Sequence, residues 1–525
     1  MANRTRRWCY AIGLAAVAGF ALLHALNLRA DFPNHSPWSM DWAKYTDEGW
    51  YGNAAIRAHL LGHWYVAGDF NPAVAAPVWP FLEWVLFFWT GVTPQAARGL
   101  AIAGFFLNLG LGYLLLRTHG SRWMALLAVV LLATSPFVYC FSRLAILEPW
   151  LTVFTLAAMN VAVRLDRWRR PVWAAFGIGL LFTVMMLTKT TAVFLLPALG
   201  WAILRPLWRR RRLALQCAAA AAAGFAAGYG AWMALVIRRG LLADYRYFFY
   251  INKYARPPGW MWPVVSLWWS FHGGLWIDRI LIPLAGVLVL WAAVWFRASR
   301  GLLLSPVFGA SVLAAAGYIL FMTYQDHPQP RYFAVVAFFC FFLVAMGTEA
   351  LLAWAGDGAM ARAAGFAVTA LIAAAVCVNG ARTLRYAAHP EYTFVNAAEQ
   401  LTHYIDAHPN GNRLLVSVSG DQITLLTHLP ALCDDFGTMT LPDKIARYRP
   451  GWFASWNDLD PGTLADLHTR DSIEQVASFP ALDDTERNVL ILFKLHPLPA
   501  GQVRDEGDEN LGVELPRDSF DAPIE

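Results

Sequence analysis

Charged residues are scarce in this sequence of 525 residues. Asp, Glu, Lys and Arg together make up only 15% of the chain, whereas 58% of its residues are hydrophobic and its mean hydropathy is +0.42. A soluble domain typically carries about a quarter charged residues and about half apolar ones. The shortage of charge therefore excludes an ordinary soluble protein and predicts an integral membrane protein.

The sequence also lacks a cysteine framework and internal repeats. Its six cysteines are single, five of them in or beside apolar segments and one in the polar C-terminal part: Cys9, Cys140, Cys217, Cys340, Cys377 and Cys433. No two of them have the spacing of a disulfide-stapled domain or of a metal site. We therefore expect neither a disulfide framework nor a resident metal ion.

Long apolar segments, by contrast, recur along most of the chain. A transmembrane helix needs about 20 apolar residues. By that measure eleven segments are candidate spans: 8–28, 95–116, 122–140, 147–163, 172–188, 190–204, 213–237, 278–296, 302–323, 331–354 and 363–380. The first follows three arginines, as in a signal peptide. Because it has no clear small-residue cleavage site and is long enough to span, we interpret it as a retained helix.

Arginines cluster in alternate connectors between these segments. The basic connectors are at residues 4–7, 117–122, 164–170, 205–212 and 297–300. The positive-inside rule places them in the cytoplasm, although the connector 355–362 contains only Arg362 and is the weakest member of the series. The outer side then receives the loops 29–94, 141–146, 238–277 and 324–330, the turn near Lys189, and everything after about residue 381. The net charge of +5 thus concerns membrane orientation and gives no reason to expect nucleic acid as a partner.

Two outer segments are unusually apolar or aromatic. Residues 77–90 contain two prolines and Glu83, which favours a helix lying on the membrane surface, with a span as the alternative. The loop 238–277 is rich in tyrosine, phenylalanine and tryptophan. Such a loop either packs at the level of the lipid headgroups or contacts a lipid-like ligand, and both interpretations stay open.

After Arg382 the composition becomes that of a soluble α/β domain. Helical periodicity at 391–407 and 423–429 and apolar strands at 413–418 and 489–493 support this interpretation. We therefore expect three parts: a membrane domain at 1–380, an extracytoplasmic α/β domain at 381–503, and an acidic disordered tail at 504–525. The histidines and acids of the α/β domain fit no metal-ligand pattern, so we expect it to have a structural or acceptor-positioning role.

Adjacent carboxylates first occur in the first outer loop, at Asp47 and Glu48. Aromatic residues of the kind that settle at a membrane–water interface flank them: Trp42, Trp50 and Tyr51. A carboxylate pair is costly to keep at the rim of a bilayer, which marks it as a candidate functional site. The alternative is a plain helix start, with Thr46 as the cap and the two acids in the first turn.

Further charged residues fall on the same outer side: Arg143, Glu148, Lys189, His327 and Arg331. Each of them alone is compatible with an interfacial residue that snorkels or forms an ion pair. Together they describe a site with several cations, which suits a phosphate headgroup because Arg and Lys donate charge-assisted hydrogen bonds to its oxygens. A nearby carboxylate suits removal of a proton from an acceptor hydroxyl. With a phosphate ester of low pKa as the leaving group, one base and the cations suffice for a single inverting displacement.

The order and topology of these motifs resemble those of the C-type membrane glycosyltransferases, in particular the bacterial relatives of the protein O-mannosyltransferases and aminoarabinose transferases. The similarity covers about residues 8–380 in layout. The matching stretches are Asp47-Glu48 in the first outer loop, Ser142-Arg143-Leu144-Ala145 followed by Glu148, Thr188-Lys189-Thr190, and Arg331-Tyr332 at the start of a late span.

The resemblance implies an α-helical enzyme of the bacterial inner membrane, with about eleven spans and its active site on the periplasmic side. Its donor would be a polyprenyl-phosphate-linked sugar held among membrane lipids, and its acceptor a glycan, a lipid or a protein. Asp47 would be the catalytic base, with Glu48 as the alternative, and Glu148 a second acidic position. No cofactor and no divalent metal are expected.

The donor phosphate is the point at which the sequence departs from the family. Family members often carry Lys-Pro-Pro before the surface helix, whereas this chain has Ala75-Ala76-Pro77. The phosphate-binding cation must therefore come from elsewhere. The candidates are Arg143, Lys189, His327 and Arg331, with Lys189 and Arg331 favoured.

Two other functions are compatible with many spans. A transporter or flippase of lipid-linked sugars would place polar or broken-helix features near the bilayer midplane, whereas the charges here gather at the outer rim. A non-catalytic anchor for the C-terminal domain would not need eleven spans. The sequence therefore favours a glycosyltransferase.

Overall fold

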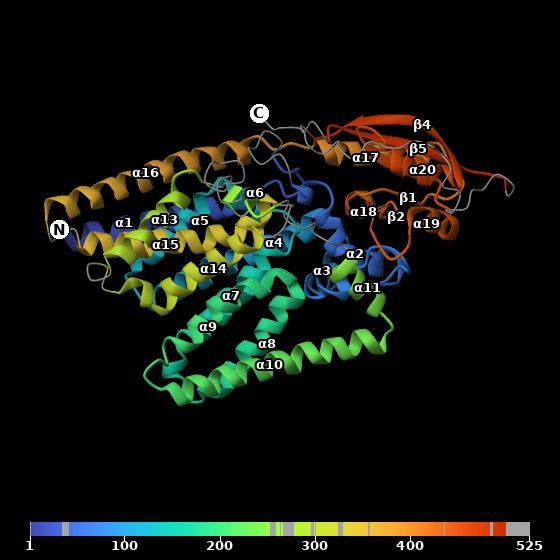
Figure 1. Ribbon diagram of the computed structural model, residues 1–525. Helices are drawn as coiled ribbons and strands as arrows, with labels where there is room; N and C mark the ends of the chain where they lie inside the picture. The colour runs from blue at the N-terminus through green and yellow to red at the C-terminus, as the bar shows by residue number, and fades with distance from the viewer. Residues whose placement is uncertain are drawn as a thin grey trace.

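The computed structural model describes residues 2–33, 41–251, 259–262, 264–265, 278–295, 299, 301–323, 329–354, 358–434, 436–482 and 487–499. Within them the chain is mostly helical, with a small C-terminal sheet, as predicted (Figure 1). His327 and the acidic tail 504–525 lie outside the described residues, so the predictions for them stay predictions.

The helices fall into three groups. Those of the membrane part are α1 (Ala2–His24), α4 (Pro94–Leu116), α5 (Arg122–Thr134), α6 (Pro136–Ser142), α7 (Glu148–Ala162), α8 (Pro171–Thr188), α9 (Leu196–Leu204), α10 (Arg211–Arg238), α13 (Leu281–Val294), α14 (Pro306–Thr323), α15 (Phe333–Trp354) and α16 (Ala359–Ala388). The outer loops contain, in the first loop, the 3-10 helices η1 (Trp42–Lys44) and η2 (Pro72–Val74) and the α-helices α2 (Asp47–Leu61) and α3 (Val78–Thr90), and, in the loop 238–277, the short helix α11 (Leu242–Arg246). The C-terminal domain contains α17 (Thr393–Ala407), α18 (Gly420–Thr427), α19 (Leu441–Tyr448) and α20 (Pro461–His468).

Each of the eleven predicted spans contains a helix, but eleven membrane crossings are not confirmed. In the described chain seven helices are long and apolar enough to cross a membrane, or eight if the bent pair α5 and α6 is one span. The other three segments form the shorter helices α7, α9 and α13, of 15, 9 and 14 residues. A 15-residue helix is only about 22 Å long, shorter than a hydrocarbon core of roughly 30 Å.

The bend between α5 and α6 has a local cause. Pro136 has no backbone N–H to continue α5, and Ser135 caps the new helix, its Oγ accepting a 3.2 Å hydrogen bond from the backbone N–H of Val138. The two helices meet at 67°. This bend turns the chain into the short connector that leads to Glu148 at the start of α7.

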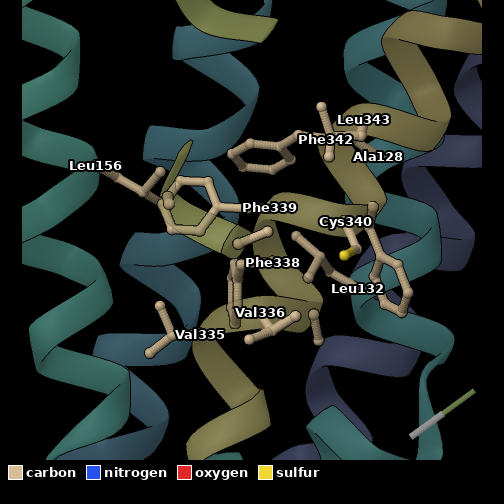
Figure 2. Close-up of a cluster of buried hydrophobic side chains, with 14 of the residues drawn as sticks. Ala128, Leu132, Leu156, Val335, Val336, Phe338, Phe339, Cys340, Phe342 and Leu343 are labelled. Atoms are coloured by element: carbon tan, nitrogen blue, oxygen red, sulfur yellow. The ribbon is translucent and has the colours of Figure 1, made fainter. Parts of the chain in front are cut away.

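The core of the membrane part lies around α15. This helix packs against α13, α14, α5 and α16, and its side chains are buried on all sides over most of its length. Figure 2 shows Phe339 of α15 beside Leu156 of α7, with Ala128 and Leu132 of α5 on the opposite side. A helix that is apolar all round is expected at the centre of a bundle.

Helices α8 and α10 pack against each other through small residues. A Cβ added at Gly179 or at Gly224 would overlap backbone atoms of the opposite helix. Thr183 Oγ1 also donates a 3.2 Å hydrogen bond to the carbonyl oxygen of Phe225. Such a close approach of two backbones is typical of membrane helix pairs. In Figure 1, α10 forms the lower edge of the molecule and α16 the upper edge.

The C-terminal domain is built on a five-stranded sheet of order β2-β1-β3-β5-β4. Its strands are β1 (Leu415–Val416), β2 (Ala431–Leu432), β3 (Trp452–Trp456), β4 (Asp471–Pro480) and β5 (Val489–Pro497). Strand β1 is parallel to β2 and β3, whereas β5 is antiparallel to β3 and β4. Leu415 and Val416 enter different apolar clusters, as the alternation of side chains along a strand requires. The strands predicted at 413–418 and 489–493 are β1 and β5.

The first outer loop lies between the membrane helices and the C-terminal domain (Figure 1). Its helix α2 packs against α3 and against α18 of the C-terminal domain. At the other end of the loop, the Asp31 carboxylate accepts hydrogen bonds of 2.8 and 3.3 Å from the backbone N–H groups of Phe394 and Val395, at the start of α17. The soluble domain is therefore docked on the loop that carries Asp47 and Glu48.

Candidate active site

The predicted carboxylate pair forms the first two residues of α2. Both side chains are buried, Asp47 at 1% exposure and Glu48 at 0%. Because successive residues of a helix project about 100° apart, the two carboxylates point into different surroundings. Each of them therefore has its own environment and its own possible role.

Glu48 lies away from the cavity described below, in a network of hydrogen bonds that occupies both of its carboxylate oxygens. Its two oxygens accept a bidentate pair of hydrogen bonds from Arg98 of α4, at 2.7 and 2.6 Å. The backbone N–H of Ala145 and the side-chain amide of Gln422 each donate a further bond at 2.8 Å. A carboxylate that accepts four hydrogen bonds is fixed in place and joins the segments that donate them. Glu48 therefore fits a structural role better than the role of a catalytic base.

Asp47 instead lines a cavity and faces Arg331. Its Oδ2 lies 2.9 Å from Arg331 Nε, but the pair lacks hydrogen-bond alignment, and neither atom has a hydrogen-bond partner among the described residues. Arg331 is held from its other side by Asp41, whose oxygens accept bonds of 2.6 Å from the guanidinium and 2.8 Å from the backbone N–H of Arg331. Asp47 and Arg331 thus form a buried ion pair, and Asp41 holds the guanidinium in place.

Burial controls the protonation of Asp47. It raises the pKa of this carboxyl to about 6, against the opposing effect of the Arg331 guanidinium, and the neighbouring Asp41 raises it further. A carboxyl with a pKa of about 6 is largely ionised at neutral pH and is a stronger base than an ordinary aspartate. Asp47 therefore has the electrostatic properties of a general base.

The cavity has a volume of about 480 Å³, and Asp47, Lys189 and Arg331 are the charged residues of its described lining. Lys189 follows α8 and forms an ion pair with Glu148 at the start of α7. The Tyr332 ring lies beside both cations, with its centroid 4.6 Å from Lys189 Nζ and 4.9 Å from the centre of the Arg331 guanidinium. The cavity thus presents two cations and one carboxylate together.

The remaining lining is mostly aromatic and comes from distant parts of the chain. The apolar lining residues are Trp42, Trp50, Tyr51, Phe70, Ala76, Leu147, Val193, Phe194, Phe248, Phe249, Phe321, Tyr332 and Phe436. Phe436 belongs to the C-terminal domain, and its ring centroid lies 4.9 Å from that of Trp50 and 6.0 Å from that of Trp42. The soluble domain therefore contributes directly to the wall of the cavity.

A buried ion network joins this domain to the first outer loop. Arg57 of α2 contacts Asp69 at 2.5 Å and Asp421 of α18 at 3.0 Å, and Lys444 of α19 contacts Asp69 at 3.2 Å. All four side chains are at most 3% exposed. Lys444 Nζ also donates to the carbonyl oxygens of Cys433 and Phe436, at 2.6 and 2.5 Å, and so fixes the loop that presents Phe436. Two positive and two negative charges are thus paired inside the interface.

Of the cations predicted to bind phosphate, Lys189 and Arg331 lie in the same cavity, and Arg143 does not. The Arg143 guanidinium donates hydrogen bonds to four carbonyl oxygens at the C-terminal end of α1, those of Leu23, His24, Leu26 and Asn27. Cations are stabilising at that end of a helix. Arg143 is therefore a helix-capping residue in the structure. Glu148 does not line the cavity but forms an ion pair with Lys189, which does.

Sequence reasoning missed several residues that build the site. Asp41 carried a local signal, because an aspartate before a short helical turn is a common cap, and it does cap η1. Arg98, Gln422 and Phe436 carried none, since their partners are tens to hundreds of residues away. Among the described residues no group of three His, Cys, Asp or Glu side chains is placed to hold a metal ion. The expectation that no metal is needed stays a prediction.

Comparison with known proteins gives a family match over part of the chain and a shared fold. Residues 74–230 match the family described as dolichyl-phosphate-mannose-protein mannosyltransferase. This segment includes Glu148 and Lys189, begins after Asp47 and ends before Arg331. No curated protein sequence matches the chain.

Solved structures of glycosyltransferases share the overall architecture. ArnT from Cupriavidus metallidurans bound to undecaprenyl phosphate is 14% identical, with 91% of this chain and 97% of that chain covered and a TM-score of 0.58. The archaeal oligosaccharyltransferase AglB from Archaeoglobus fulgidus, in complex with an inhibitory peptide and a dolichol-phosphate, is 11% identical, with 89% and 73% covered and a TM-score of 0.51. At these identities the structures show a common fold. The family match and this fold confirm the predicted resemblance, the glycosyltransferase class of the enzyme and its multi-pass membrane nature.

Proposed function

We propose that this protein transfers a sugar from a polyprenyl-phosphate donor to a hydroxyl group on the extracytoplasmic side of the membrane, with Asp47 as the base. The observation that carries the proposal is the cavity in which Asp47 lies with Lys189 and Arg331. It combines a carboxylate able to accept a proton with two cations able to hold a phosphate.

The reaction is a single displacement at the anomeric carbon of the donor sugar. Asp47 takes the proton of the acceptor hydroxyl, and the acceptor oxygen forms a bond to the anomeric carbon. The bond between that carbon and the phosphate oxygen breaks, and its electron pair leaves with the polyprenyl phosphate. Lys189 and Arg331 stabilise the negative charge that develops on this phosphate. One displacement inverts the anomeric configuration.

The apolar lining suits the lipid part of the donor. Val193, Phe194 and Phe321 lie on the side of the cavity formed by the membrane helices, near Lys189, and a prenyl chain has the same chemistry as these side chains. The undecaprenyl phosphate bound by ArnT and the dolichol-phosphate bound by AglB support a lipid phosphate as the ligand. The surrounding membrane lipids would hold the rest of the chain.

The orientation of the site follows from the positive-inside rule. The arginine-rich connectors place the first outer loop and the C-terminal domain on the extracytoplasmic side, which in a bacterial inner membrane is the periplasm. The acceptor is a hydroxyl-bearing glycan, lipid or protein that reaches the cavity from that side. Transport is not favoured, because the family that matches residues 74–230 is described as a mannosyltransferase.

Binding of an added polyprenyl phosphate, measured by native mass spectrometry, tests the phosphate site. Lys189→Met alone would leave Glu148 buried without its partner, so the informative variant is the double substitution Lys189→Met with Glu148→Gln. We expect it to bind the lipid about 10- to 100-fold more weakly than wild type, the value of one charge-assisted hydrogen bond.

Two controls make this result specific. Glu148→Gln alone frees Lys189 from its ion pair and is expected to bind the lipid at least as tightly as wild type. Lys494→Met removes a lysine of β5 outside the cavity and should leave binding unchanged. Equal affinity of the double variant and Glu148→Gln would contradict the assignment of Lys189 to the donor phosphate.

A further inference from the structure

The helix that presents Asp47 begins without a cap of its own. The backbone N–H groups of the first turn of a helix have no partner within the helix and need one from outside. Thr46, at the N-cap position, makes no capping hydrogen bond to the backbone of that turn. Its Oγ1 lies 2.8 Å from the carbonyl oxygen of Trp42 instead. The first turn of α2 is therefore stabilised by other groups.

One of these groups is Gln422, in the first turn of α18. Its side-chain Oε1 accepts a 2.8 Å hydrogen bond from the backbone N–H of Gly49, the third residue of α2. Its Nε2 donates a 2.8 Å bond to the Glu48 carboxylate. Gln422 is buried, at 1% exposure. A side chain of the C-terminal domain thus supplies the capping interaction that the sequence around Thr46 does not.

The surrounding groups leave the Gln422 amide only one orientation. A backbone N–H can only donate, and the Glu48 carboxylate, paired with Arg98, can only accept. The oxygen of the amide must therefore face Gly49 and its nitrogen must face Glu48. Both contacts form together, and the rigid Arg98–Glu48 pair extends the restraint to α4.

The glycine at position 49 allows this contact to form. A Cβ at this position would overlap the backbone atoms of Asp421 and Gln422, so the two helices could not come as close with any other residue there. The next residue, Trp50, donates a 3.0 Å hydrogen bond from its indole N–H to the carbonyl oxygen of Val418. The first turn of α2 is thus fixed to the C-terminal domain at two successive positions.

We infer that Gln422 is a positioning residue, which orients the Asp47 carboxylate by fixing the first turn of α2 from the C-terminal domain. This inference rests on the proposed role of Asp47 as the base. It assigns the C-terminal domain an indirect part in the chemistry, because the geometry of the base depends on a side chain 375 positions further along the chain. A displacement of a reacting group by about 1 Å can lower a rate about 100-fold.

The test compares Gln422→Met, which keeps the length of the side chain and removes both hydrogen bonds, with the matched control Gln400→Met on the exposed side of α17. Turnover of a polyprenyl-phosphate sugar is measured against donor concentration and against pH. We expect Gln422→Met to lower kcat about 10- to 100-fold and leave the KM for the donor within about threefold. The acidic limb of the pH profile of turnover, which reports the ionisation of the Asp47 carboxyl, should also shift.

A structural role alone would lower the melting temperature of Gln422→Met and leave kcat and the acidic limb as in Gln400→Met, and that result would overturn the inference. A pair of charge variants decides the matter if Gln422→Met fails to fold. Gln422→Glu places a carboxylate against Glu48, and the double variant Gln422→Glu with Glu48→Gln restores a donor facing an acceptor. Turnover in the double variant above that of Gln422→Glu supports the inference, and wild-type turnover in Gln422→Glu itself contradicts it.

The variant Asp47→Asn separates this inference from the proposed function. Near-normal turnover by Asp47→Asn would refute the base itself. A large loss in Asp47→Asn together with unchanged turnover in Gln422→Met would leave the base in place and refute only the positioning role of Gln422.

Discussion

Replacement of Asp47 by asparagine removes the proposed base and keeps the shape of the side chain. The amide is not basic, so it cannot take the proton of an acceptor hydroxyl. Arg331 loses one of its two carboxylate neighbours but keeps Asp41, at 2.6 Å. Its charge therefore becomes more available to a phosphate, and we expect the donor lipid to bind at least as tightly as to the wild-type protein.

The expected loss of turnover follows from the role of a general base. Such a group typically contributes about 100- to 10,000-fold to a rate, which corresponds to about 2.7 to 5.4 kcal/mol of activation free energy. Loss of one negative charge next to Arg331 should leave donor affinity unchanged or raise it. A fall in turnover without a fall in donor binding therefore separates loss of the base from a change in donor affinity.

Asp41→Asn is the matched control. It also removes one negative charge beside Arg331, and asparagine keeps the ability to cap η1. Turnover and donor binding are measured for both variants in the same reconstituted membranes. We expect at least a 100-fold loss of turnover for Asp47→Asn and a much smaller loss for Asp41→Asn.

Two outcomes would refute this reasoning. Near-normal turnover by Asp47→Asn would show that Asp47 is not the base. Equal losses in the two variants would show that both carboxylates act only through the Arg331 guanidinium.

Three further predictions concern pH, the domain interface and topology. The value of kcat/KM should fall about tenfold per pH unit below about pH 6, because the pKa of Asp47 is raised to about 6 and only the ionised carboxylate accepts a proton; a flat profile between about pH 4.5 and 7.5 would contradict this. Arg57→Met should lower the free energy of unfolding by about 3 to 5 kcal/mol in thermal melts, since it leaves two buried carboxylates with one lysine, whereas Arg413→Met at an exposed ion pair should cost less than about 1 kcal/mol. A reporter that is active only in the cytoplasm should stay silent when fused after Arg382, and strong activity there would reverse the assigned orientation.

The sequence was sufficient to predict the elements that depend on local patterns. Apolar length located all eleven helical segments, and short apolar runs located β1 and β5. It did not predict where a helix breaks inside an apolar segment. The segment 190–204 begins as a 3-10 helix and continues as the nine-residue α9, and Pro197 in the first turn of α9 has no backbone N–H with which to continue a helix from before it.

Of the site residues, only those that are charged residues in an apolar protein could be predicted from the sequence. Asp47, Lys189 and Arg331 are costly to bury in an apolar protein, so their side of the membrane was enough to group them. Arg143 met the same criterion and yet caps α1, because a charge pattern does not say which carbonyl groups lie nearby. The partners of Glu48 come from α4 and α18, and no local pattern could show that these segments meet at the start of α2.

A cryo-electron microscopy structure with added polyprenyl phosphate tests the central claim most directly. The account predicts phosphate oxygens within about 3 Å of Lys189 Nζ and of the Arg331 guanidinium, with the Asp47 carboxylate on the adjacent wall of the same cavity. A lipid phosphate bound at a place where neither Lys189 nor Arg331 contacts it would contradict the account.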